Sequence, residues 1–127
     1  MAVSEETNQI AKEIVDAAYK VHTGLGPGLL ESVYEVCLGY ELTKKNLKFK
    51  SQVILPVIYD DVKLDAGFRL DLLVEDQIIV ELKAIEQLLP IHNAQLLTYL
   101  KLSKIKLGLL INFNVPLIKN GIRRLIN

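Results

Sequence analysis

The most constraining feature of the sequence is the run LGLLINF at residues 107–113, in which nearly every side chain is apolar. Such a run is typical of a β-strand that is covered on both faces, because a strand with one face in water alternates apolar and polar residues. We therefore expect a sheet that is flanked by helices.

The first 45 residues have the period of helices. An apolar stripe predicts an amphipathic helix over residues 4–22, and the glycines and the proline within residues 24–28 end it. A second helix is expected over residues 28–45. The residues that this helix is expected to bury are Leu30, Val33, Tyr34, Cys37 and Leu38.

After Asn46 the period changes to that of strands. Residues rich in β-branched side chains predict strands over 48–60, 62–74 and 77–84, and Pro56 indicates an edge or a bulge in the first. Pro90 opens a helix that is expected to continue to residue 103. The tail after the apolar run is either one more strand or a short helix. The predicted order is α-α-β-β-β-α-β-(β/α), an α/β fold of the mixed α+β kind, in a single domain over residues 1–127.

The composition excludes several classes of protein. Half of the residues are hydrophobic and 24% are charged, which fits a globular protein and excludes a disordered tail. No apolar run approaches the roughly 20 residues that span a bilayer, and the acidic start is neither a secretory signal nor a transit peptide. A single cysteine, Cys37, excludes an internal disulfide, a four-cysteine zinc site and an iron–sulfur cluster within one chain. We expect a cytoplasmic protein without a membrane partner.

The formal net charge of zero hides an uneven distribution of charge. All fifteen acids lie between Glu5 and Glu86 together with nine bases, so this stretch carries a net charge of −6. Residues 87–127 contain six bases and no acid, a net charge of +6. The asymmetry points weakly to a polyanionic partner, but bases that only keep a Leu- and Ile-rich segment in solution explain it more simply.

Two predicted strands place charged side chains on one face. Alternation puts Arg69 and Asp71 on one face of the first strand, and Glu81 and Lys83 on one face of the second. If the hairpin turns symmetrically about Asp76, then Asp71 lies opposite Glu81 and Arg69 opposite Lys83. A register shift of one residue would separate the charged groups, whereas a shift of two would not. The residues expected on the other face of the first strand are Leu70, Leu72 and Val74.

Two carboxylates that face each other across a ladder repel. Either one of them is protonated, with a raised pKa, or a divalent cation lies between them, because Mg²⁺ prefers oxygen ligands. Lys83 would then hold a water or a phosphate oxygen beside the ion. The alternative is an ordinary surface on which the charges form diagonal salt bridges.

Residues on the predicted helices add weaker signals. Glu31 lies at the edge of the buried stripe, although an acid in the first turn of a helix also favours the helix dipole. Tyr34, one turn on, fits a core position with its hydroxyl at the rim. Gln95 and Tyr99 are four residues apart and share a helix face, as an exposed, helix-stabilising pair also would.

The chain resembles the small proteins named for the motif GxxExxY, which is written here as GLLESVY at residues 28–34. These proteins are grouped with the PD-(D/E)XK nuclease-like superfamily. The likeness runs from about Ile10 to Arg124 through the blocks LGPGLLESVYE, FRLDLLVEDQIIVELKA, AQLLTYLK and GLLINF, and four blocks in the same order make it specific. The resemblance implies a restriction-endonuclease-like core and a metal-dependent nuclease that hydrolyses phosphodiester bonds of nucleic acid.

The resemblance also implies roles for individual residues. Asp71 would be the acid of the first core motif, and Glu81, Leu82 and Lys83 would form the ExK motif. The two carboxylates and the Leu82 carbonyl would hold Mg²⁺ or Mn²⁺, and Glu31 would reach the ion directly or through water. Lys83 would position the attacking water and help to deprotonate it.

A QxxxY helix motif is implied by the same resemblance. Gln95 and Tyr99 would orient the site and the substrate backbone. The residue before Asp71 is Leu70, where the name of the superfamily has proline.

The bases of the C-terminal third are candidates for a nucleic-acid track whose contacts would be blind to sequence. These bases are Lys104, Lys106, Arg123 and Arg124. No role is expected for His22 and His92, which fit a helix cap or a packed imidazole, or for Cys37, which fits a small buried residue.

Two alternatives remain open at this stage. The protein is either the nuclease described above or a non-catalytic module that keeps the fold and binds nucleic acid or another protein. A homodimer that pairs residues 107–113 across subunits, or a recruiting protein partner, is compatible with both.

Overall fold

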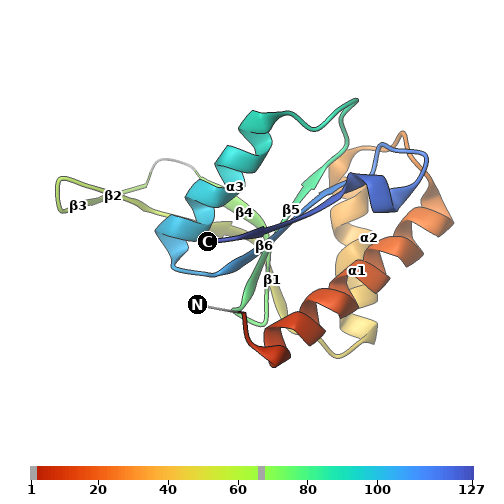
Figure 1. The fold of residues 1–127 in the computed structure, drawn as a ribbon, viewed down its shortest axis with the longest axis horizontal. Coiled ribbons are helices and arrows are strands. Elements are labelled where there is room, and N and C mark those ends of the chain that lie inside the picture. Colours follow the sequence, from red (N-terminus) through yellow and green to blue (C-terminus); the bar gives the residue numbers. More distant parts are fainter. Residues whose placement is uncertain (1–2, 66–67) are drawn as a thin grey trace.

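A computed structural model describes residues 3–65 and 68–127 of the chain. Within these residues, a five-stranded mixed sheet lies between helices α1 and α2 on one face and helix α3 on the other (Figure 1). The expected α/β architecture is confirmed, and it is consistent with a restriction-endonuclease-like core.

Helices α1 and α3 begin at residues that suit a helix N-terminus. Helix α1 (Glu5–Leu25) follows Ser4, whose hydroxyl accepts a hydrogen bond from the amide of Thr7 at 3.1 Å. Helix α3 (Pro90–Ser103) begins at a proline, and the ring of His92 caps it by accepting a backbone amide. No helix in the described part of the chain is long and apolar enough to cross a membrane.

Helix α2 (Glu31–Lys44) begins three residues later than predicted. Gly28 has a φ of +99° and Leu30 is extended, so the backbone before the helix is not helical. Leu30 is therefore outside the buried stripe and is 74% exposed. Of the five core residues expected for this helix, two are buried, one is half-buried and two are exposed. The buried residues are Tyr34 and Leu38, the half-buried one is Cys37, and the exposed ones are Leu30 and Val33.

The large sheet combines one parallel pair with antiparallel pairs. Its strands, in spatial order, are β1 (Phe49–Ile54), β4 (Arg69–Val74), β5 (Ile78–Lys83), β6 (Leu107–Asn112) and β7 (Ile122–Ile126). Only β5 and β6 run parallel in this sheet of the described residues, and α3 connects them. The C-terminal tail contains both predicted alternatives, a short 3₁₀ helix (Ile118–Gly121) followed by β7.

The two long strands predicted for residues 48–60 and 62–74 are each divided in two, which corrects the sequence-based prediction. The end of the first and the start of the second form a separate two-stranded hairpin of β2 (Val57–Tyr59) and β3 (Val62–Leu64), which projects from the body (Figure 1). The break before β2 falls at Pro56, which cannot donate to a ladder. Residues 66–67, inside the second predicted strand, lie outside the described residues.

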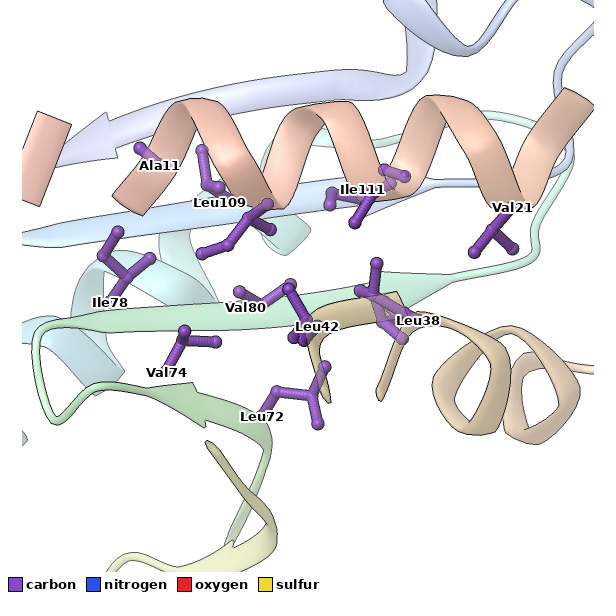
Figure 2. Close-up of a cluster of buried hydrophobic side chains, with 14 of the residues drawn as sticks. Ala11, Val21, Leu38, Leu42, Leu72, Val74, Ile78, Val80, Leu109 and Ile111 are labelled. Atoms are coloured by element: carbon purple, nitrogen blue, oxygen red, sulfur yellow. The ribbon is translucent and has the colours of Figure 1, made fainter. Parts of the chain in front are cut away.

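Strand β6 is buried on both faces, as its apolar run predicts. Leu109 and Ile111 pack with α1 and α2, as Figure 2 shows, whereas Leu110 packs with the cluster beneath α3. Because β5 and β7 cover both of its edges, β6 offers no surface to a second copy. A dimer that pairs through residues 107–113 would therefore have no exposed strand to use.

His22 has the structural surroundings expected of it, whereas Cys37 is less buried than expected. His22 is buried, and its Nε2 lies 2.7 Å from the carbonyl oxygen of Val115. Cys37 is a free thiol at the side of α2 and is only partly buried.

Candidate active site

The β4–β5 hairpin carries the predicted carboxylates. Its register is the one expected for a turn centred on Asp76, since Leu72 lies opposite Val80. This register keeps the acidic residues of both strands on the same side of the pair. The predicted pairing of Arg69 with Lys83 is not part of the ladder, because the β4–β5 register ends at the pair of Leu72 and Val80.

Beyond the last pair, carboxylate side chains replace the backbone ladder. The amide of Asp71 donates to Glu81 Oε2 at 3.0 Å, and the amide of Leu82 donates to Asp71 Oδ2 at 2.8 Å. Each carboxylate therefore accepts a backbone amide of the opposite strand. This reciprocal arrangement holds the two acids side by side.

Strand β4 changes faces at the same point. In a regular strand Leu70 and Leu72 share a face, but Leu72 packs with α1 and α2 whereas Leu70 packs beneath α3. The β1–β4 register skips Gln52 and Asp71, and Gln52 has a φ of +52°. The expectation that Leu70 and Leu72 lie on one face is therefore wrong, because β1 and β4 both change faces at this unpaired position.

Glu81 is the most buried acid of the site, with 7% of its surface exposed. Burial, followed by the negative charge of Asp71, raises the pKa of Glu81 to about 9. The positive charge of Lys83 acts in the opposite direction but is outweighed. Repulsion between paired carboxylates is relieved either by protonation of one acid or by a bound cation, and the raised pKa corresponds to protonation.

Tyr34 fixes the start of α2. Its hydroxyl donates to the carbonyl of Gly26 at 2.6 Å and accepts the amide of Leu29 at 3.1 Å. Its ring stacks on Phe113 with centroids 4.5 Å apart and planes at 6°. These contacts tie the loop before α2 to the end of β6, and so place Glu31 at the first turn of the helix.

Helix α2 contributes two carboxylates one turn apart, Glu31 and Glu35. Partial desolvation, followed by the charge of Asp71, raises the pKa of Glu31, and Lys83 opposes this shift. Desolvation also raises the pKa of Glu35, to which Asp71 adds. The charge of Asp71 therefore acts on both glutamates of α2.

Helix α3 brings Tyr99 to the other side of the site. Tyr99 is 6% exposed, so it does not belong to an exposed pair, and its ring packs edge-on against Phe68 at 5.7 Å. Burial, followed by the charges of Glu81 and Asp71, raises the pKa of its hydroxyl. Gln95 is exposed one turn earlier on the same helix.

Lys83 and the Leu82 carbonyl occupy the end of β5. The Lys83 carbonyl accepts the amide of Phe113, and so it points toward β6. Because successive carbonyls of a strand point in opposite directions, the Leu82 carbonyl points toward β4 and Asp71. Among the ion pairs of the described residues, none involves Lys83 or the two acids of the strands. The alternative of diagonal salt bridges is therefore not what the site shows.

The four predicted nucleic-acid-binding bases do not lie together. Lys104 and Lys106 line a hollow beside Asp76, at the opposite end of the sheet from Lys83. Arg123 donates to Asn93 of α3, whereas Arg124 donates to Asn8 of α1. The two arginines thus lie on opposite faces of the sheet.

Sequence reasoning missed two residues of the site, Glu35 and Gln52. The Gln52 carboxamide donates to Glu35 at 2.8 Å and to Asp71 at 3.4 Å. The signal for Glu35 was its spacing of four residues from Glu31, which places both on one side of a helix. The sequence carries no comparable signal for Gln52.

The donor set fits a small divalent cation in its chemistry. Asp71, Glu81, Glu31 and the Leu82 carbonyl supply the oxygen ligands that Mg²⁺ and Mn²⁺ prefer. Lys83 follows Glu81 and Leu82 on β5. In the residues that the structure describes, however, no three acids, histidines or cysteines are gathered closely enough to hold a metal ion.

Comparison with known proteins gives one match. A family model described as the PD-(D/E)XK nuclease superfamily matches residues 8–125. Neither the curated proteins nor the solved structures give a match. The match covers the helix of Glu31, both strands of the carboxylate pair and the helix of Tyr99.

Proposed function

The chain belongs to the PD-(D/E)XK nuclease superfamily, and from this membership we propose that it is a metal-dependent nuclease acting at the Asp71–Glu81 site. The observation that carries the proposal is the reciprocal bonding of the two carboxylates, with Lys83 two residues after Glu81. An acid pair of this kind, beside an amine and within reach of two helices, suits hydrolysis of a phosphodiester.

Nucleases of this superfamily generally use divalent metal ions. We propose that Asp71, Glu81 and the Leu82 carbonyl hold Mg²⁺ or Mn²⁺, with Glu31 completing the ligand set. A bound ion supplies positive charge against the negative charge that develops on the phosphate oxygens. Binding the ion requires Glu81 to release its proton.

The remaining side chains act on the water and the substrate. Lys83 would position the attacking water and help to remove its proton, while Gln95 and Tyr99 would hold that water or a neighbouring phosphate. Arg123 lies opposite Leu110, on the face that α3 covers, which supports a phosphate contact for this base. Lys104, Lys106 and Arg124 stay predictions as contacts to a longer nucleic acid. The cytoplasmic location expected from the sequence belongs to the same proposal.

The test is a cleavage assay with labelled single- and double-stranded DNA and RNA, with and without Mn²⁺. Lys83→Ala and Asp71→Asn are expected to lower the rate by about 100-fold or more. Lys12→Ala, at an exposed position of α1, is the matched control and is expected to cleave like the wild type. Cleavage that survives in both site variants would show a contaminant or a different site.

The second candidate is a non-catalytic module that binds nucleic acid or protein. It is favoured by the dispersal of the potential ligands, since no three of them gather among the described residues. Calorimetry with Mg²⁺ and Mn²⁺ separates the two functions, because a non-catalytic module is expected to bind neither ion.

A further inference from the structure

We infer that Gln52 is a positioning residue of the candidate active site, which orients the carboxylate of Asp71 by bridging it to Glu35. The inference rests on the proposed function, because it assigns Gln52 to the same site. The backbone of Gln52, its place in the sheet and its hydrogen bonds each support it.

The backbone of Gln52 is unusual for its position. In the described part of the chain, six of the seven non-glycine residues with positive φ lie at tight turns or helix ends. These six are Asn46, Asp60, Asp61, Glu75, Asp76 and Lys104. Gln52, with a φ of +52°, lies inside β1. L side chains rarely adopt this conformation, and it persists mainly where the surroundings hold it, often at functional sites.

This backbone carries β1 from one face of the sheet to the other. Phe49 packs with the cluster beneath α1 and α2, whereas Val53, four residues on, packs with the cluster beneath α3. In a regular strand both would share a face. Gln52 therefore leaves the sheet at the place where β4 makes the same change at Asp71.

The side chain of Gln52 donates hydrogen bonds to two acids. Its Nε2 lies 2.8 Å from Glu35 Oε1 and 3.4 Å from Asp71 Oδ1. A primary amide has two N–H groups, one for each acceptor. The other oxygen of Asp71 accepts the amide of Leu82, so both oxygens have a fixed partner. Groups that orient a ligand in this way typically contribute 10- to 100-fold to metal affinity or activity.

Two variants separate the backbone of Gln52 from its carboxamide. Gln52→Gly adopts the positive φ freely but has no side chain, whereas Gln52→Met keeps the length and the strained backbone but cannot donate. We expect both to weaken Mn²⁺ binding at least about tenfold in calorimetry. Gln52→Gly is expected to melt at or above the temperature of the wild type, and Gln52→Met below Gln52→Gly. Asp76→Gly, which relieves a φ of +54° at the other end of the hairpin, is the control with unchanged Mn²⁺ affinity.

Each outcome decides the inference. Weaker Mn²⁺ binding in both variants, with no loss of melting temperature in Gln52→Gly, supports it. Wild-type Mn²⁺ affinity in either variant overturns it. A melting temperature of Gln52→Gly several degrees below that of the wild type also overturns it, because the role would then be one of folding. If the wild type itself binds no Mn²⁺, the proposed function fails and the inference fails with it.

Discussion

The two ends of the β4–β5 pair are built from the same strands in opposite ways. At the turn end, apolar residues such as Leu72 and Val80 form regular ladder pairs and pack beneath α1 and α2 (Figure 2). At the other end, Asp71 and Glu81 interrupt the ladder and accept its amides through their side chains.

The difference shows how stability and chemistry are separated along two short strands. The apolar end gains its stability from burial and regular pairing. The acidic end brings together two carboxyl groups whose joint ionisation opposes folding, and the neighbouring ladder holds them in place. Changes at the first end should therefore alter stability alone, and changes at the second should alter the responses to pH and metal.

The largest effect is expected at the apolar end. Leu72 is fully buried, and Leu72→Ala should lower the free energy of unfolding by about 3 kcal/mol, because it removes apolar contacts and leaves a cavity. Denaturant unfolding measures the loss. The Mn²⁺ affinity of the folded variant should match that of the wild type. A decrease of less than about 1 kcal/mol in the free energy of unfolding would contradict the contrast between the two ends.

The next effect is a dependence of stability on pH that arises at the acidic end. Because the pKa of Glu81 is raised from 4.5 to about 9 in the folded state, the folded protein binds more protons than the unfolded chain between these values. Stability should therefore fall as pH rises, by at most about 1.4 kcal/mol per pH unit, or about 2.7 kcal/mol from pH 6 to pH 8.

Denaturant unfolding in a metal chelator at pH 6, 7 and 8 tests this slope. Glu81→Gln removes the titrating group and should flatten the profile. A wild-type profile that is flat, or that rises with pH, would contradict the assigned environment of Glu81.

An effect with the same upper limit, about tenfold in affinity for each pH unit, is expected for Mn²⁺. The ion competes with the proton on Glu81, so affinity should increase between pH 6 and pH 8, and one proton should be released on binding. Calorimetry in buffers of different ionisation enthalpy counts that proton. Equal affinities across this range would argue against Glu81 as a ligand.

The smallest effect is expected from a carboxylate at the turn. Asp76 is exposed and forms an ion pair with exposed Lys50 at 3.4 Å. Asp76→Asn keeps a residue that tolerates the positive φ of the turn, and should change the free energy of unfolding by less than about 0.5 kcal/mol. A larger loss would mean that the two ends of the hairpin do not differ as described.

Sequence reasoning succeeded where one local rule decides the outcome. The short turn at Asp76 fixes the register of β4 and β5, and the apolar run of β6 requires burial on both faces. It failed for Leu70, because no period in the sequence shows that two neighbouring strands reverse faces together. The roles of the site residues themselves stay predictions.

Other parts of the site depend on distant contacts. Gln52 reaches Glu35 only because β1 and α2 meet in three dimensions. The C-terminal bases were predicted to form one track because the net charge of a segment does not show on which face of the sheet each base lies. Arg123 and Arg124, adjacent in β7, point to opposite faces as any neighbouring strand residues do.

The projecting β2–β3 hairpin has a consequence for how the molecule exchanges hydrogen with solvent. Its strands pair with each other, and Ile58 and Tyr59 are each about two-thirds exposed. Isolated two-stranded ribbons are only marginally stable. The amides of β2 and β3 should therefore exchange through local opening, whereas those of β6 should exchange only on global unfolding. Binding of a macromolecule to the β2–β3 hairpin would then slow deuterium uptake in the hairpin and leave the uptake of the core strands unchanged.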